Sequence, residues 1–430
     1  MNRQTTRAKG QLTRRLFPLY TAAFFQGTSF FFPIEKLFMI EIGFTPATIG
    51  LMVAFYAAFV PLIEAPSGIL ADRWSRKYVL VIASVALMAM GLIGGVSQGV
   101  PSYLLATVFL SVFLAMFSGT YDAVLYDVML EETGTSDAFE THIGRLRFVF
   151  GLAVMLTSLL GGVLASLFGL RFTYFAGLPL IAISVAALLR FREPQLHKSQ
   201  EALSLRSQVA QTYRVIFQRS TVLPTVAILV AAALLTNVVV EFSSLWLIAL
   251  AVGVALYGPL GAGILAADGF GGLLAGRARL DRRIVVTIVS VLLVASSLAL
   301  ILVQHTAVVM AAHITTAGIA AVIAIAGTRR LHDQVPSNVR TGVASGVGAL
   351  TWMVFVPFSI VFGTWAEHSG VFAASWMILP LAILASALLV KISADAHSSA
   401  SAMKAIDSTG AQMSSPSATA PAASQSIRDS

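Results

Sequence analysis

Three features are scarce in this chain, and each scarcity excludes a class of protein. There is no cysteine among its 430 residues, which excludes disulfides, thiolate metal sites and cysteine nucleophiles. Charged residues make up only 11%, whereas a soluble domain carries roughly a quarter. The period-two alternation of a membrane β-barrel is also missing. The class that remains is an all-helical membrane protein.

Long apolar runs are what the chain has instead. Hydrophobic residues make up 57% of it, in runs long enough to cross a hydrocarbon core as helices. Helices are expected because lipid leaves every backbone polar group to be satisfied within its own segment. The first run is too long for a signal peptide, so it is expected to be an uncleaved span. The twelve expected helices cover about 16–39, 47–70, 79–98, 103–126, 145–168, 172–191, 221–246, 254–276, 284–303, 307–327, 341–364 and 371–392.

The distribution of positive charge predicts the topology. With the N-terminus in the cytoplasm, all but Lys36 and Arg171 of the 28 lysines and arginines fall on the cytoplasmic side. A wrong helix count would scramble this bias. The net charge of +8 is therefore attributed to orientation, and no nucleic-acid partner is expected. The prediction is a multi-pass protein of the inner (plasma) membrane with both termini in the cytoplasm.

Polar connections and a weak repeat divide the chain into two halves. Gly50 to Gly68 has the spacing of Gly258 to Gly276, and an Asp-Arg pair follows each, as expected of a transporter built by duplication. The longest polar connection has apolar residues at helical spacing, which is typical of an interfacial helix. The predicted parts are a cytoplasmic N-terminal segment (1–15), an N-terminal six-helix bundle (16–191), a cytoplasmic central loop (192–220), a C-terminal six-helix bundle (221–392) and a disordered cytoplasmic tail (393–430).

The most specific motif follows the second span. From Gly68 to Lys77 it reads G-I-L-A-D-R-W-S-R-K, which resembles the signature loop G-x-L-A-D-R-x-G-R-K of the major facilitator superfamily. Ser75 stands where that loop usually has glycine. The ends of the fourth and sixth spans and the loop before the eleventh support the resemblance. It implies twelve transmembrane helices in two pseudo-symmetric six-helix bundles that transport by alternating access.

The resemblance also implies a role for the motif. In that superfamily the aspartate locks the two halves in one access state, while neighbouring arginines pair across them. A carboxylate at a helix N-terminus is favoured by the exposed N–H groups, and the eleventh span is expected to supply that terminus for Asp72. The alternative is a basic loop that only fixes orientation. The predicted gate latch consists of Gly68, Asp72, Arg73, Arg76 and Lys77.

Two departures separate the chain from the drug:proton antiporters that it otherwise resembles. Ala115 occupies a position where those proteins often carry an arginine in the fourth helix. Thr157 and Ser158 precede Gly161 and Gly162 where they often have a G-P-x-x-G-G motif. Proton-driven export is the leading hypothesis, and uptake of a metabolite by a proton symporter or a facilitator is the alternative.

Acidic residues at membrane depth are the candidates for proton coupling. A charge at mid-bilayer costs about 2.5–3.5 kcal/mol, so such groups usually face a cavity or a partner. Asp268 and Glu241 are the deepest, and each could instead be a structural acid. Glu64 and Asp122 lie nearer the cytoplasmic ends, where structural roles near the latch are expected. Glu35 and Lys36, at the end of the first span, are expected to reach the interface by snorkelling.

Polar and aromatic side chains within the spans are the candidates for the substrate cavity. An amide among aromatic rings would suit an apolar or cationic cargo, although such stripes more often serve packing. A histidine could relay protons, or it could be satisfied by a backbone carbonyl. The candidates are Gln26, Phe30, Asn237, His313 and Trp352.

Other functional classes find no support in the sequence. The chain has no G-x-x-x-x-G-K-[ST] motif for ATP hydrolysis and no H-E-x-x-H motif. Gly95-Val-Ser-Gln-Gly99 matches G-x-S-x-G, but it lacks the strand-to-helix context of a nucleophile elbow. No enzyme activity, cofactor or metal is expected. The expected partners are a small-molecule substrate, protons and the lipid bilayer, with the chain acting as a monomer.

Overall fold

The apolar runs are helices throughout the computed structural model, which describes residues 3–135, 139–194, 222–275, 280, 282–335 and 340–394. Eleven described helices have the length and apolarity to cross a membrane, and the first apolar run is divided between a helix that ends at Gln26 and two shorter helical segments. The first half of the chain contains α1 Arg3–Gln26, η1 Phe32–Ile34, α2 Glu35–Glu41, α3 Pro46–Arg73, α4 Arg76–Val96, α5 Val100–Thr133, α6 Phe139–Phe168, α7 Leu170–Ala176 and α8 Leu178–Arg190.

The second half contains α10 Leu223–Ala249, η2 Val254–Leu256, α11 Tyr257–Ala275, α12 Arg283–Leu302, α13 Thr306–Gln334, α14 Arg340–Ser369, α15 Val371–Ala374 and η4 Ser375–Met377. The last span runs over Val371–Ala394. The expected interfacial helix, the C-terminal tail and the expected cap before α14 lie outside the described residues.

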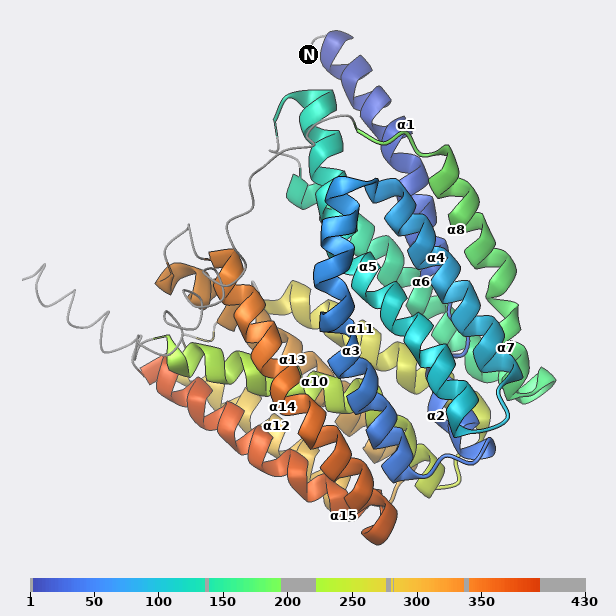
Figure 1. The fold of residues 1–430 in the computed structure, drawn as a ribbon. Helices are drawn as coiled ribbons and strands as arrows, with labels where there is room; N and C mark the ends of the chain where they lie inside the picture. Colours follow the sequence, from blue (N-terminus) through green and yellow to red (C-terminus); the bar gives the residue numbers. More distant parts are fainter. Residues whose placement is uncertain are drawn as a thin grey trace, which may run out of the picture.

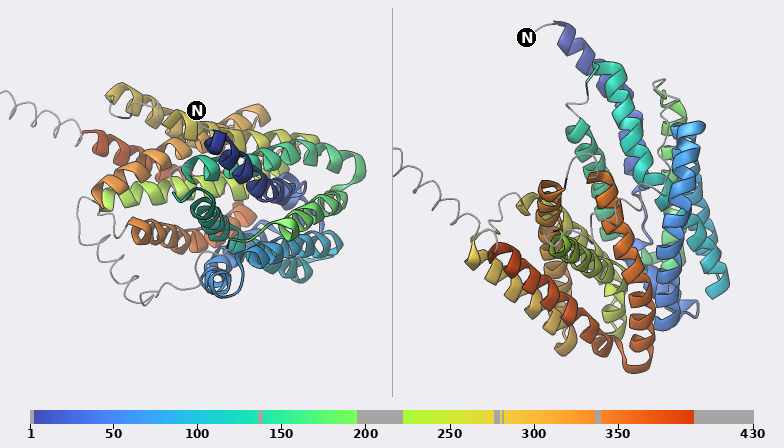
Figure 2. Two further views of the ribbon diagram at one scale, coloured as in Figure 1. Left: turned by 90° about the horizontal axis from the view of Figure 1, so that it is seen from above. Right: turned by 60° about the vertical axis from the view of Figure 1, so that its left-hand side comes forward.

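The two halves form two helical bundles that meet at one end and diverge at the other (Figures 1 and 2). The end where α3 finishes and α4 begins carries Arg73, Arg76 and Lys77, and is called the basic face here. The other end, where α3 begins and α14 finishes, is called the opposite face. The bundles meet near the opposite face and separate toward the basic face.

Glycines allow the bundles to meet closely at two helix crossings. α14 packs along α3, and α11 packs along α6. A Cβ atom on Gly50 of α3 would lie 2.3 Å from the Ser359 carbonyl oxygen of α14. A Cβ atom on Gly258 of α11 would lie 2.6 Å from the Ser158 carbonyl oxygen of α6. Backbone therefore touches backbone across both crossings, as small residues permit between membrane helices.

Two of the expected spans are broken. The run over 16–39 was expected to be one helix, but α1 ends at Gln26 and the chain continues through η1 into the short helix α2. Proline at the start of η1 favours a new helical start, and Gly27 fits where a Cβ atom would lie 2.7 Å from the Phe150 carbonyl oxygen. The sixth span is similarly divided into α7 and α8 at Gly177. The first break turns α2 toward the second bundle.

Candidate functional site

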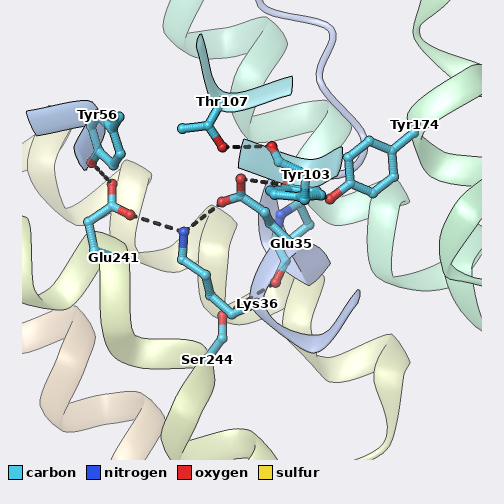
Figure 3. Close-up of polar contacts among 9 residues, drawn as sticks. Glu35, Lys36, Tyr56, Tyr103, Thr107, Tyr174, Glu241 and Ser244 are labelled. Atoms are coloured by element: carbon cyan, nitrogen blue, oxygen red, sulfur yellow. Dashed lines mark hydrogen bonds and ion pairs between the residues drawn. The ribbon is translucent and has the colours of Figure 1, made fainter. Parts of the chain in front are cut away.

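A cluster of buried charges joins the two bundles near the opposite face (Figure 3). Lys36, on α2 of the first bundle, has its Nζ atom 3.1 Å from an Oε2 of Glu241, on α10 of the second bundle. The same Nζ atom lies 2.7 Å from Oε2 of Glu35. One ammonium group is therefore shared by two carboxylates, one from each half of the chain.

Tyrosine hydroxyls complete the hydrogen bonding of both carboxylates (Figure 3). Tyr103 of α5 donates to Oε1 of Glu35 at 2.9 Å, and its hydroxyl also lies 2.8 Å from that of Tyr174 on α7. Tyr56 of α3 donates to Oε1 of Glu241. The first bundle thus contributes both a cation and a neutral donor to the carboxylate of the second bundle.

The ion pairs of this cluster are buried, so losing one partner is costly in free energy. Lys36 is only 5% exposed and Glu35 only 8%, so the expectation that they snorkel to the interface is wrong. The reason is the break after Gln26, which places α2 between the bundles rather than at the end of a continuous span. Removing one partner from a buried ion pair typically costs about 3–5 kcal/mol, because the remaining charge is left uncompensated.

The face of α10 that carries Glu241 continues toward the basic face. Residues three and four apart share one side of a helix, so Ala233, Asn237, Glu241 and Ser244 form a stripe. At one end of the stripe, the Ser244 hydroxyl lies 3.5 Å from the Pro33 carbonyl oxygen of the first bundle. Asn237 lies one turn beyond Glu241 in the direction in which the bundles separate.

A pocket of about 340 Å³ opens beside this stripe, between α10, α13 and α14. Its lining includes Asn237 and Trp352, two of the cavity residues predicted from the sequence, together with Thr328 and Thr351. The other lining residues are aliphatic or glycine. The structure therefore brings two of the five cavity candidates together, one helical turn from the ion pair.

Asp268 lies on the side of α11 that faces α6, but it is distant from the cluster along its helix. Gly258, Gly261, Leu265 and Asp268 follow one another at spacings of three and four, so they share a face. The first two contact α6 at the crossing. Asp268 continues this face toward the basic face, is exposed, and makes no hydrogen bond or ion pair with any residue that the structure describes.

Glu64 and Asp122 lie apart from the buried cluster. Asp122 of α5 pairs with Arg147 of α6 at 3.1 Å, within the first bundle. Glu64 is an exposed residue of α3, and its carbonyl oxygen accepts a hydrogen bond from Ser67 at 2.9 Å. Glu241, one of the four acids predicted as proton carriers, contacts both bundles through described side chains.

Gln26 lies inside the first bundle, where it is only 1% exposed. It donates to the Ser84 hydroxyl at 2.7 Å and accepts from the Tyr121 hydroxyl at 2.7 Å. Phe30 is buried in the break after α1, where its carbonyl oxygen packs against Gly161 of α6. In this conformation both residues hold helices of the first bundle together.

His313 lies inside the second bundle and is fully buried. Its Nδ1 atom is 2.8 Å from the Val309 carbonyl oxygen, and its ring packs edge-on against Trp246 of α10. Its Nε2 atom has no partner among the described atoms. The backbone contact is the arrangement that the sequence left open as the alternative to a proton relay.

The signature loop is held by contacts within the first bundle. Arg76 pairs with Asp127 of α5 and donates to the Ala123 carbonyl oxygen at 3.2 Å. Lys77 donates to the Leu189 carbonyl oxygen at 2.8 Å. Gly68 and Arg73 are exposed, and the side chain of Asp72 lies outside the described part of the structure.

Ser75 is the N-cap of α4. Its backbone is extended, with φ −167°, so the position requires no glycine. Its hydroxyl accepts from the Tyr78 N–H at 3.2 Å and donates to Glu193 at 2.5 Å. Glu193 also accepts from the Arg76 N–H at 2.6 Å. The Ser75 hydroxyl thus accepts from one of the free N–H groups at the start of α4, and the Glu193 carboxylate accepts from another.

Among the described residues, no group of three or more His, Asp and Glu side chains is arranged to hold a metal ion. The arrangement consists instead of two helical bundles, a polar tie at the end where they meet, and a pocket beside that tie. This is the architecture of a membrane transporter.

Comparison with known proteins identifies the family. The sequence profile of the Major Facilitator Superfamily matches residues 16–354, and the chain belongs to this superfamily. It is 22% identical over 207 residues to an uncharacterized MFS-type transporter of Methanocaldococcus jannaschii, a match that covers 46% of this chain and 50% of that protein. The chain therefore matches about half the length of this relative.

Solved transporters share the fold. A nucleoside transporter superposes with a TM-score of 0.70 at 17% identity, covering 89% of this chain and 99% of that one. A bacterial homologue of the human lysosomal transporter Spinster, in an inward-facing and unoccupied conformation, gives 0.67 at 15% identity over 90% and 96%. A D-xylose–proton symporter gives 0.64 at 13% identity over 88% and 96%. The protein is a multi-pass membrane transporter with the twelve-helix fold of its superfamily.

Proposed function

We propose that this chain is a proton-coupled exporter of a small molecule and that Glu241 is its coupling acid. The observation that carries the proposal is the position of Glu241, whose carboxylate binds Lys36 and Tyr56 of the first bundle at the end where the bundles meet. Breaking these two contacts is part of any motion that separates the bundles there.

The ion pair within the first bundle determines which group loses its partner when the bundles separate. Glu35 and Lys36 both belong to α2, so they remain a neutral pair when the bundles separate. Glu241 then loses its only described cation. A nearby cation favours the ionised form of a carboxyl group, so loss of the Lys36 contact favours a protonated Glu241, and re-forming that contact favours release of the proton.

This cycle carries protons from the opposite face to the basic face. The proton binds Glu241 when the site is open to the opposite face, and it leaves when the bundles meet there again. With the basic face in the cytoplasm of a cell with an inner membrane, protons move inward, and cargo leaves in the other half of the cycle. Each chain supplies both bundles, so a monomer is sufficient.

Two observations favour this assignment over the remaining acids and states. Asp122 pairs with Arg147 within the first bundle, and Asp268 makes no hydrogen bond or ion pair with a described residue, so both are secondary candidates for the proton, together with Glu64. The conformation is closed at the opposite face, like the inward-facing Spinster homologue with which it superposes. We assign the signature loop from Gly68 to Lys77, with Asp72, Arg73 and Arg76, to latching the basic face in the alternate state.

Proteoliposomes that contain an internal pH dye test the proposal. Hydrophobic cations, neutral heteroaromatic compounds and small metabolites are screened as cargo with wild type, Glu241→Gln and Asp268→Asn. Proton movement triggered by one of these compounds, lost in Glu241→Gln and retained in Asp268→Asn, is the expected result.

Other outcomes separate the alternatives. Cargo and protons moving in the same direction would make the chain an uptake symporter of the same coupling design. Cargo flux without proton movement, and unchanged in Glu241→Gln, would make it a facilitator and would remove the coupling role from Glu241.

A further inference from the structure

The pocket beside α10 has a chemistry of its own. None of its described lining residues carries a charge, and most are aliphatic. The Thr328 and Thr351 hydroxyls donate to the carbonyl oxygens of their own helices, at 2.8 and 2.9 Å. Their donors are therefore occupied, and only acceptor lone pairs face the pocket.

Asn237 is the exception, because its carboxamide makes no hydrogen bond with any described residue. A primary amide offers two donors and an acceptor, and a partly buried amide without partners is costly. Trp352 adds an aromatic face to the wall; its described ring contact is edge-on with Phe355, at 6.0 Å between centroids. One amide and one indole in an apolar wall match a flat group with a polar edge.

The position of the pocket connects it with the space between the bundles. On α14, Gly348 and Trp352 continue the face that carries Ser359, which touches Gly50 of the first bundle. On α10, Asn237 continues the face that carries Glu241. Both stripes run along their helices from the contact region toward the basic face, where the bundles diverge (Figure 2), so the pocket lies on the side of the contact region where the bundles separate.

We infer that this pocket is a cargo subsite for an uncharged, flat heteroaromatic group whose lactam-like edge pairs with the Asn237 carboxamide while its ring packs on Trp352. The inference rests on the proposed transport function and names the class of cargo. Four residues of α-helix span about 6 Å, so an occupant bound to Asn237 lies one turn from the Lys36–Glu241 pair. Cargo binding therefore acts next to the tie that the proton controls.

Equilibrium binding to the purified full-length protein in lipid nanodiscs tests the subsite without requiring transport. Three probes of similar shape are compared: 2-quinolinone, which has a lactam edge; naphthalene, which has none; and N-methylquinolinium, which is a permanent cation. We expect saturable binding of 2-quinolinone at one site, with naphthalene about tenfold weaker, because one or two hydrogen bonds are lost, and with the cation weaker still.

The variants assign the binding to this pocket. Asn237→Ala is expected to weaken 2-quinolinone binding about tenfold and leave naphthalene binding unchanged, whereas Trp352→Leu weakens both. Asn237→Gln, which keeps the amide one methylene further out, and Trp352→Phe, which keeps a ring, retain part of the affinity. Trp376→Leu, at a tryptophan that is 49% exposed, is the matched control and has no effect.

Three results would overturn the inference: no saturable binding of 2-quinolinone, equal binding of N-methylquinolinium, or 2-quinolinone affinity unchanged in Asn237→Ala. Failure of the transport proposal is distinguishable from these. Amide-dependent binding without proton-coupled flux would reject the transport cycle alone. Proton-coupled flux of a cargo that is unchanged by substitution of Asn237 or Trp352 would reject the subsite alone.

Discussion

At the scale of single residues, the two carboxylate partners of Lys36 differ in how they are connected to it. Glu35 is its neighbour in the chain and always within reach, whereas Glu241 is within reach only when the bundles meet. The ammonium group therefore keeps a counter-ion when the bundles separate, whereas Glu241 loses its described cation. This asymmetry supports the proposal that the acid of the second bundle, rather than the lysine, is the group whose charge changes with the motion.

A double-mutant cycle measures this coupling. Lys36→Met removes the cation while keeping most of the side-chain volume, and it is expected to lower the stability of the detergent-solubilised protein by about 3 kcal/mol, because two buried carboxylates lose their partner. Glu241→Gln alone costs less, since the amide can still accept from Tyr56. In the double variant the loss is expected to be smaller than the sum, with a coupling of about 1–3 kcal/mol.

The thermal midpoint and the denaturant dependence of unfolding provide the measurement. Lys391→Met, at an exposed lysine near the end of the last span, is the matched control and should be within about 0.5 kcal/mol of wild type. Strictly additive losses would show that Lys36 and Glu241 do not interact in the folded protein.

At the scale of elements, the two glycine crossings set how closely the bundles approach. α3 crosses α14 at Gly50, and α6 crosses α11 at Gly258, in each case with backbone against backbone. A side chain at either point pushes apart the helices that close the opposite face. The basic face is not affected directly, because the bundles have already separated there.

Gly50→Ala is expected to favour the state open at the opposite face about tenfold or more. Its Cβ atom would meet the Ser359 carbonyl oxygen at 2.3 Å, and overpacking of this kind costs about 1–3 kcal/mol. A reporter cysteine at Ser243, a buried residue of α10, should then react faster with a maleimide. Gly144→Ala on α6 is the control, since nothing lies within 4 Å of that Cβ atom, and an equal effect of both variants would refute the role of the crossing.

The elements also show what the sequence could and could not predict. Hydropathy predicted the helical fold and the approximate position of most spans, because a span is a local property of about twenty residues. It did not show the break after Gln26, because the run from Phe30 onward is as apolar as the helix before it. Glu35 and Lys36 were therefore assigned to a solvated end, although they lie between the bundles.

The same limit applies to the site. The spacing of Asn237 and Glu241 on one helical face could be read from the sequence, and both were predicted candidates. The pairing of Glu241 with Lys36 could not be predicted from the sequence, because it depends on how the two bundles pack against each other. Ser75 stands where the similar loop usually has glycine, and only the structure shows that the chain there is extended and that serine serves as an N-cap.

At the scale of the whole molecule, the divergence of the bundles predicts which side of the membrane reaches the site. The absence of cysteine means that single reporter cysteines need no background substitutions. Thr328→Cys, in the wall of the pocket, is expected to react with a membrane-impermeant maleimide applied from the basic face only. Ser243→Cys is expected to be protected from both sides.

Inside-out and right-side-out vesicles distinguish the two faces. Adding Lys36→Met should release the protection of Ser243→Cys at the opposite face and slow the labelling of Thr328→Cys, because the population moves toward the alternate state. Labelling of Thr328→Cys from the opposite face in the otherwise unaltered chain would contradict the arrangement of the bundles described here.

The unequal spacing of the bundles at their two ends has a consequence for the surrounding lipid. The conformation is broader at the basic face (Figure 2), so it would displace more area from one leaflet than from the other, and the proposed alternate state would reverse this difference. A bilayer under asymmetric lateral pressure therefore does work on the switch. Lipids with small headgroups, enriched in one leaflet, would shift the balance of access states without touching the cargo site, and the membrane itself would act as a regulator of transport rate.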